Sequence, residues 1–443
     1  MMLEVGAVLA LSPEQLAALN RDPTPRLFLA EITTDLDIPR FASALNTALR
    51  AHEIFAYQPT RVEGYRTLRL QQIEAPLRVS VSETKLTGTH EAEIEKALAA
   101  WLERIQSNDL AAGKIIRVEA AHAAGRCWIA LLVNPLFLDL SSARNLFLEA
   151  IGIHHGKTPT PVAFQYPQYI EWRRELEQGE ETRAGKAYWD ACLEKNPAPL
   201  PPLLSYRATK IVEGEEKARQ HVTLLIDTCQ AGQLAALAQT HGTNVEVLLQ
   251  AIWWVLLAKL TDFDPFVAGW RHDCRADYAV MAGAVGVFEK TLPVFIDVKA
   301  DERLNEWLAR FAGMAQEHLE QQEYWPLATP PIDTHLAVGF GVSPVLNEAN
   351  NQWHIREVPG ALSDFELALH VQERGNELEL SIDAESSRYA LQAIERLLQQ
   401  MGVLLTVILA QPEARIGEID LVGDEERAFL LKQNPAQRDF GNQ

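Results

Sequence analysis

A proline-rich segment near the middle of the chain, Asn196-Pro-Ala-Pro-Leu-Pro-Pro202, places the strongest constraint on its fold. Proline fixes φ and lacks a backbone N–H, so four prolines within seven residues can continue neither a helix nor a central strand. The segment divides the 443 residues into near halves. Because a chain of this length is too large for one ordinary hydrophobic core, we expect two lobes of roughly 200 residues each.

Both halves carry the same kinds of secondary-structure pattern. Short apolar runs bounded by turn residues predict strands at 27–32, 115–121, 127–133, 222–226, 266–268, 336–340, 366–372 and 377–382. Amphipathic or apolar runs with capping residues predict helices at 39–51, 91–105, 141–151, 169–177, 183–193, 229–239, 244–260, 304–321 and 386–409. This interleaving predicts two similar α/β halves, each a mixed sheet with helices.

Charge and cysteine content limit the classes of partner. The 60 acidic and 40 basic side chains give a formal net charge of −20, which disfavours nucleic acid and anionic membranes. The four cysteines lie too far apart for a zinc or redox motif and suit a reducing compartment. The N-terminus lacks the basic region of a signal peptide, and we find no run of the ~18 apolar residues that a spanning helix needs. We therefore expect a cytoplasmic protein without a metal site.

The stretch Asn134-Pro-Leu-Phe-Leu-Asp-Leu140 is the most informative functional signal. It joins a predicted buried strand to the predicted helix 141–151, for which Ser141 or Ser142 is the expected N-cap. Strand-to-helix junctions are where α/β enzymes often place their chemistry. This junction offers an amide, a proline ring and the Asp139 carboxylate, but no histidine and no nucleophile.

Motifs in a characteristic order resemble those of the condensation domains of non-ribosomal peptide synthetases, members of the chloramphenicol acetyltransferase-like superfamily. They lie at 11–15, 51–53, 165–172, 188–189, 286–293, 416–421, 425–430 and 432–440, the last being similar to a linker that leads into an adenylation domain. The resemblance implies an α/β fold with two acetyltransferase-like lobes in a V-shaped pseudodimer. Residues 1–178 would form the N-terminal lobe. Residues 179–443 would form the C-terminal lobe, with the crossover and the start of a linker to a following domain.

The resemblance also implies a tunnel between the lobes, into which two carrier proteins deliver thioesters. The family motif at the junction reads His-His-x-x-x-Asp-Gly, and its second histidine assists attack of the amine. By match to this motif the second histidine is replaced by Pro135, which has no side-chain donor or acceptor. The first is replaced by Asn134, which cannot act as a base at pH 7. Loss of such a general base typically slows a reaction by ~100- to 10,000-fold.

Asp139 is the motif position that this chain retains. In the family this aspartate is structural and pairs with an arginine from a loop of the other lobe. Arg271 and Arg275 are the candidates, and the spacing to Gly286 favours Arg275. An aspartate near a strand end is also a common helix cap, so both roles remain open for Asp139.

Two further motif positions are changed, since Leu140 replaces the motif glycine and Lys290 replaces an asparagine. We expect Leu140 to add bulk to the tunnel and Lys290 to lie on its side. His272 is a second tunnel-side candidate, with Asp273 as the acid that would orient it as a substitute base. The other histidine candidates are interpreted as structural: His52, His154, His155 and His318.

These departures resemble degenerate family members of the X-domain and β-hydroxylase interface-domain types. The resemblance implies a domain without condensation activity that recruits a trans-acting oxygenase to an amino acid on a peptidyl carrier protein, as in some siderophore synthetases. A non-haem iron amino-acid β-hydroxylase is favoured over a haem monooxygenase as this partner. The domain itself would hold no cofactor, because phosphopantetheine belongs to the carrier, and an adenylation domain would be a neighbour.

Two alternatives remain. The domain would be an unusual but active condensation domain if positioning of the two thioesters alone lowered the barrier enough. A free-standing acyltransferase that uses coenzyme A fits less well, because that class also needs the histidine.

Overall fold

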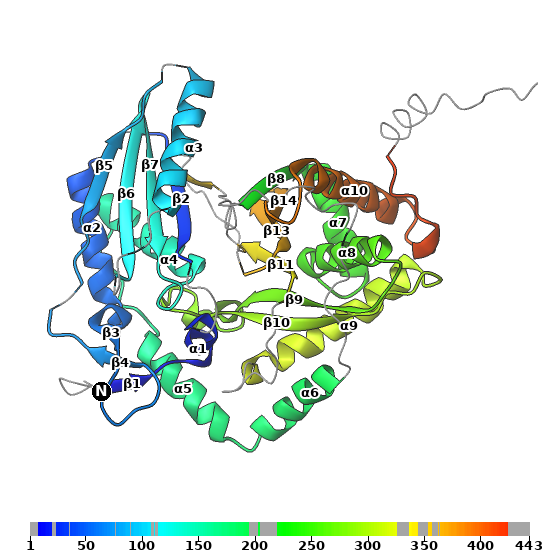
Figure 1. Ribbon diagram of the computed structural model, residues 1–443, viewed down its shortest axis with the longest axis horizontal. Coiled ribbons are helices and arrows are strands. Elements are labelled where there is room, and N and C mark those ends of the chain that lie inside the picture. Colours follow the sequence, from blue (N-terminus) through cyan, green and yellow to red (C-terminus); the bar gives the residue numbers. More distant parts are fainter. Residues whose placement is uncertain are drawn as a thin grey trace, which may run out of the picture.

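The computed structural model describes residues 8–19, 24–34, 36–75, 77–88, 90–107, 110, 114–194, 203, 219–325, 336–343, 353–356, 362 and 364–423. It consists of two α/β lobes that diverge from a pair of helices, α5 (Tyr166–Gln178) and α6 (Thr182–Glu194), which run beneath them (Figure 1). The expected pair of α/β lobes is thus confirmed. The proline-rich segment 196–202 and the motifs at 425–430 and 432–440 lie outside the described residues.

The N-terminal lobe is built on a five-stranded mixed sheet. In spatial order the strands are β12 (Trp353–Arg356), β2 (Arg26–Ile32), β7 (Arg126–Val133), β6 (Ile116–Ala123) and β5 (Val81–Lys85). Helices α2 (Ile38–Ala51) and α4 (Leu140–His154) pack on one face, and α3 (Glu91–Ser107) packs on the other. Because both faces are covered, β7 is buried along nearly its whole length and its sequence reads as one apolar run.

A small antiparallel sheet completes this lobe near its base. It consists of β1 (Val8–Ala10), β4 (Arg69–Gln72) and β3 (Tyr57–Thr60). Helix α1 (Pro13–Leu19) follows β1, and the Ser12 hydroxyl caps it by accepting from the Gln15 N–H at 3.1 Å.

The C-terminal lobe contains a six-stranded mixed sheet. Its strands, in spatial order, are β10 (Glu289–Ile296), β9 (Phe266–Asp273), β11 (Val338–Ser343), β13 (Leu367–Arg374), β14 (Glu377–Glu385) and β8 (Arg219–Ile226). Four helices pack with this sheet into one large core: α7 (Thr228–Thr240), α8 (Val245–Leu260), α9 (Leu304–Glu320) and α10 (Leu391–Ala410). Helix α8 is apolar around its whole circumference because it is buried on all sides.

Helix α10 differs from the sequence expectation that no segment could span a membrane. It has 20 residues and is apolar enough to pass that test by composition, whereas α7 and α8 pass it only as a pair that meets at 93°. The apolar face of α10, which includes Leu397, Met401 and Leu404, packs into the C-terminal core. This packing accounts for its composition.

Two segments from the second half of the chain belong structurally to the first lobe. Strand β12 pairs antiparallel with β2, and the loop between β9 and β10 contributes Met281, Val285 and Phe288 to the N-terminal core. The lobes are therefore joined by exchanged segments as well as by α5 and α6. The boundary expected after residue 178 coincides with the end of α5.

Most predicted elements are present, and two of the six missed strands, β10 and β12, have identifiable causes. The hairpin of β6 and β7 turns at Ala124-Gly125, where both residues adopt positive φ. Strand β10 was not predicted because Pro293 interrupts its pattern. Proline is tolerated there since β10 is an edge strand of its sheet. Strand β12 has only four residues, too few for a readable alternation.

Candidate functional site

The stretch Asn134–Leu140, which was matched in sequence to the histidine motif, forms the turn between β7 and α4. The Asn134 side chain is used within this turn: its Oδ1 accepts from the Leu136 N–H at 3.0 Å, and its Nδ2 donates to the Lys114 carbonyl at 3.4 Å. Pro135 is a half-buried ring with no donor of its own. Neither position therefore supplies a group that can take up or release a proton near neutral pH.

Asp139 is fully buried and has two roles at once. It caps α4, because its Oδ1 accepts from the Ser142 N–H at 2.8 Å, so the predicted cap at Ser141 or Ser142 is wrong. It also forms a bidentate ion pair with Arg275, with nitrogen–oxygen distances of 2.9 and 3.0 Å. Two backbone N–H groups from the segment that enters β10 donate to its Oδ2 at 2.8 and 3.2 Å. The five donors leave the carboxylate no free acceptor position.

Arg275, rather than Arg271, is therefore the arginine that meets Asp139. Its remaining donors contact the Ala284 carbonyl at 2.9 Å, the Ser142 hydroxyl at 2.6 Å and the Asp273 carboxylate at 2.9 Å. Burial opposes the ionised form of Asp139. The Arg275 guanidinium and the hydrogen bonds that Asp139 accepts nevertheless hold the pKa of Asp139 below its ordinary value. The pair joins the start of α4 to the loop after β9, and we call it the strut.

The register of β9 and β10 decides which side chains face the space between the lobes. His272 lies opposite Lys290, and Asp273 lies opposite Glu289. Because directly opposed residues share a face, His272 and Lys290 lie on one side of this ribbon and Asp273 and Glu289 on the other. Asp273 and Glu289 line the inter-lobe pocket, as does Arg271. His272 and Lys290 do not line this pocket, so the expectation that they lie on the tunnel side does not hold for it.

His272 and Lys290 have structural partners on their own side. His272 Nε2 lies 2.7 Å from the carboxylate of Asp277, so Asp273 is not its partner. Lys290 Nζ donates to the carbonyls of Gln322 and Trp325 at 2.9 and 3.0 Å and lies 3.7 Å from the buried Glu14. Burial lowers the pKa of Lys290 below its ordinary value.

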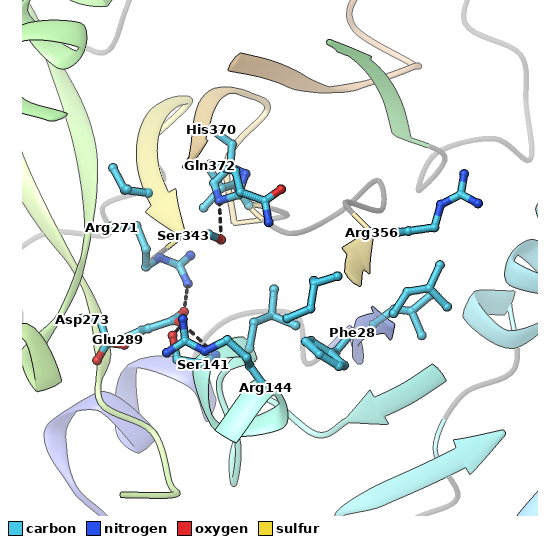
Figure 2. A pocket seen from close by; sticks show the side chains of 16 residues that line it. Phe28, Ser141, Arg144, Arg271, Asp273, Glu289, Ser343, Arg356, His370 and Gln372 are labelled. Carbon is cyan, nitrogen blue, oxygen red and sulfur yellow. Dashed lines mark hydrogen bonds and ion pairs between the residues drawn. The ribbon is translucent and has the colours of Figure 1, made fainter. Parts of the chain in front are cut away.

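The pocket between the lobes has a cavity volume of about 90 Å³ and opens to solvent. Its walls come from β2 and β12, the first turn of α4, and β9, β10, β11 and β13 (Figure 2). Leu140 lines it, as expected from the changed motif, whereas Pro135 is not among the lining residues. Apolar side chains form much of the wall: Leu27, Phe28, Leu29, Leu140, Val342, Ile355 and Leu362.

A network of ion pairs that the sequence did not reveal crosses one side of this pocket. Arg26 of β2 binds both carboxylate oxygens of Asp364 at 2.9 and 3.0 Å and lies 3.4 Å from Glu289. Arg271 reaches the same two carboxylates, and the Ser141 hydroxyl donates to Glu289. Burial and the Asp139 charge raise the pKa of Glu289 above its ordinary value.

The histidines interpreted as structural have structural environments. His52 contacts Glu149 at 2.9 Å. His318 lies between the Tyr188 hydroxyl and the Pro293 carbonyl. His154 and His155 stand at the end of α4, where Gly156 has φ of +89° and closes the helix.

Two mixed-sheet lobes with a buried strut and a pocket between them define a domain of the chloramphenicol acetyltransferase type. The chain belongs to the condensation domain family, whose profile matches residues 27–328 and 345–431.

The curated relatives of this chain include tyrocidine and bacitracin synthases. Tyrocidine synthase 2 of Brevibacillus parabrevis is 24% identical over 427 residues, covering 92% of this chain but 11% of that protein. Bacitracin synthase 1 of Bacillus licheniformis is 22% identical over 421 residues, covering 91% of this chain and 8% of that protein. The chain thus spans a small fraction of the length of the curated relatives it matches.

Solved structures of condensation-type domains share the fold. The first condensation domain of the calcium-dependent antibiotic synthetase has a TM-score of 0.76 at 15% identity, covering 94% of this chain and 99% of that chain. The X-domain from teicoplanin biosynthesis, in its complex with OxyB, has a TM-score of 0.73 at 19% identity, covering 96% and 97%. At these identities the likeness concerns the fold alone.

Proposed function

We propose that this chain is a condensation-type domain that has lost peptide-bond formation and serves as a docking platform. It recruits a trans-acting tailoring oxygenase, with an amino-acid β-hydroxylase favoured over a haem monooxygenase, to an amino acid held on a peptidyl carrier protein. Phosphopantetheine is supplied by the carrier, and an adenylation domain is the neighbour in the synthetase.

The observation that carries this proposal is Pro135 at the position of the catalytic histidine. Asn134 cannot replace the base, because both ends of its amide are used within the turn. His272 is held by Asp277 on the face of the β9–β10 ribbon opposite to the pocket. The Asp139–Arg275 strut, in contrast, is present, which fits a domain kept for binding.

The X-domain from teicoplanin biosynthesis gives this role a structural parallel, since it forms a complex with OxyB. A stable complex of this kind would bury on the order of 1,200–2,000 Å² in total.

Binding of oxygenases tests the proposal directly. The domain is titrated by calorimetry against non-haem iron β-hydroxylases and haem monooxygenases encoded beside its gene, each with and without aminoacyl carrier protein. Saturable 1:1 binding to one of them is the expected result. Absence of binding to every one of them, in both conditions, would remove the proposal.

The second candidate is condensation by positioning alone, which the retained pocket and the synthetase relatives favour. We expect no peptide product when donor and acceptor carriers are loaded and mixed with the domain. Product that survives His272→Ala would establish condensation without a histidine. A Pro135→His variant shows in the same assay whether the base alone is missing.

A further inference from the structure

A second pocket lies at the far end of α4 from the inter-lobe pocket. The first turn of α4 lines the inter-lobe pocket, whereas Leu148, Gly152 and Ile153, near the end of the helix, line the second one. Its other walls come from residues 157–164, which follow α4, and from the segment 279–284 of the loop between β9 and β10. Its cavity volume is about 350 Å³, which lies within the range of small-molecule sites. We call it the α4 groove.

Most of the groove wall is apolar. The apolar side chains include Leu148, Ile153, Pro161, Val162, Phe164 and Val280. Val280 is 51% exposed, so the groove presents apolar surface that no described segment covers. Lys157 is exposed at the rim, and its methylene groups lie beside Gly152, so its side chain extends the apolar wall.

The polar part of the groove is the contact between His52 and Glu149. His52 Nε2 lies 2.9 Å from Glu149 Oε2, so this nitrogen carries the hydrogen of the bond. The other two polar atoms of the pair, His52 Nδ1 and Glu149 Oε1, are buried and have no hydrogen-bond partner among the described residues. The side chain of His52 is 2% exposed and that of Glu149 is 22% exposed, and both line the groove. No lysine or arginine in the described part of the chain forms an ion pair with Glu149.

These two atoms favour a ligand that donates hydrogen bonds. A carboxylate oxygen can only accept, and Nδ1 of a neutral imidazole also accepts when Nε2 carries the hydrogen. A buried acceptor without a donor raises the free energy of the folded state, and a ligand N–H would remove that cost. Since a neutral His52 leaves the charge of Glu149 without a cation, a protonated amine would form a charge-assisted hydrogen bond there.

We propose that the α4 groove binds a small organic cation, namely a protonated amine on an apolar body. The ammonium group donates to the Glu149 carboxylate, which His52 positions, and the apolar body lies against Val162, Phe164 and Val280. The site is separate from the inter-lobe pocket and does not depend on the proposed function. It gives the domain a ligand that neither the changed motif nor the fold assigns.

Three probes with a similar apolar body and different polar ends test the inference: 2-phenylethylamine, 2-phenylethanol and 3-phenylpropanoate. Each is titrated into the intact chain at neutral pH, and dissociation constants are measured by NMR. We expect the amine to bind about tenfold more tightly than the alcohol, as suits one charge-assisted hydrogen bond, and the carboxylate to bind most weakly.

Two variants assign the binding to the groove. Glu149→Gln should remove the preference for the amine without changing the affinity for the alcohol. Glu175→Gln is its matched control, because it removes the same charge from an exposed position on α5. Gly283→Leu should weaken binding of both compounds severalfold, because the groove is lined by Gly283 and a Cβ there meets open space. Gly232→Leu is the control for this variant, since Gly232 of α7 has equally open space and does not line the groove.

Equal affinity for the amine and the alcohol, or a preference that persists in Glu149→Gln, would overturn the inference. Tightest binding of the carboxylate would also overturn it, because the site would then be an imidazolium that binds anions. Unchanged affinities in Gly283→Leu would place the ligand outside the groove and refute the assignment. Should Glu149→Gln fail to fold, as judged by circular dichroism, the probe series in the unmodified chain still decides the charge of the ligand, and Gly283→Leu still decides its place. None of these results depends on whether an oxygenase binds the domain.

Discussion

Replacement of Asp139 by asparagine should destabilise the protein by about 3 kcal/mol. The substitution keeps the shape of the side chain but removes the charge and turns one of its two acceptor atoms into a donor. Asp139 accepts five hydrogen bonds, two of them from Arg275. Removing one partner of a buried ion pair typically costs ~3–5 kcal/mol. We expect the lower end of that range, because Arg275 retains Asp273 and the Ala284 carbonyl.

Tryptophan fluorescence during thermal unfolding measures this effect. For a lobe of roughly 200 residues, about 3 kcal/mol corresponds to a fall of about 6–12 °C in Tm. Glu413→Gln is the control, because it breaks an exposed ion pair at 2.7 Å and should cost under ~0.5 kcal/mol. In a double-mutant cycle, Asp139→Asn and Arg275→Met should be non-additive by more than about 1 kcal/mol. A loss below about 1 kcal/mol for Asp139→Asn, or strict additivity, would refute the strut.

The same pair predicts a pH dependence. The folded-state pKa of Asp139 is depressed below 3.8, so its stabilisation is fully present above that value and is lost as the pH falls through the folded pKa. The stability gap between the unmodified chain and Asp139→Asn should therefore stay constant from neutral pH to about pH 5 and narrow only in stronger acid. A gap that already closes between pH 7 and 5 would contradict the assignment.

Two further predictions concern packing and the exchanged strand. Gly286→Ala should lower the stability by ~1–3 kcal/mol, because a Cβ there would lie 2.0 Å from the Tyr166 ring. Gly283→Ala is the control and should have almost no effect, because a Cβ there has nothing within 4 Å. Equal Tm values for the two variants would refute this prediction. Glu31 joins β2 to β12 through His354 and Arg356, and despite burial these partners lower its pKa from 4.5 to about 2. Glu31→Gln should therefore lower the free energy of unfolding by about 1–2 kcal/mol at neutral pH, after allowance for solvent screening. In urea titrations, the difference in unfolding free energy between the unmodified chain and this variant should shrink as the pH falls below 4.5. A difference that stays constant down to pH 3 would contradict the prediction.

The strut could be predicted from the sequence. The side of the β9–β10 ribbon on which His272 and Lys290 lie could not. Asp139 could be assigned because it holds a fixed place in a motif, and Arg275 because its spacing to Gly286 fits the family. The placement of His272 and Lys290 depends on strand parity, and a shift of one residue reverses the face of every side chain. Strand β10 was not recognised, so no parity was available to correct the expectation.

Arg144 was missed for a different physical reason. A single arginine in an amphipathic helix reads as part of its solvated face, and nothing local distinguishes it from Arg50 of α2, which is exposed. Arg144 is half-buried at the inter-lobe pocket because strands β9 and β10 of the second lobe lie close to the start of α4. Burial that depends on the other half of the chain leaves no signal in a local pattern.

The geometry of the junction makes the strut independent of the side chain at position 135. The strut of Asp139 and Arg275 is supported by Ser142, and each of these three side chains is held by partners other than position 135. A histidine at position 135 would add no bond to the strut, so the residue at this position does not decide whether the strut forms. It follows that Pro135→His should leave the Tm within ~2 °C of the unmodified chain, in contrast to Asp139→Asn.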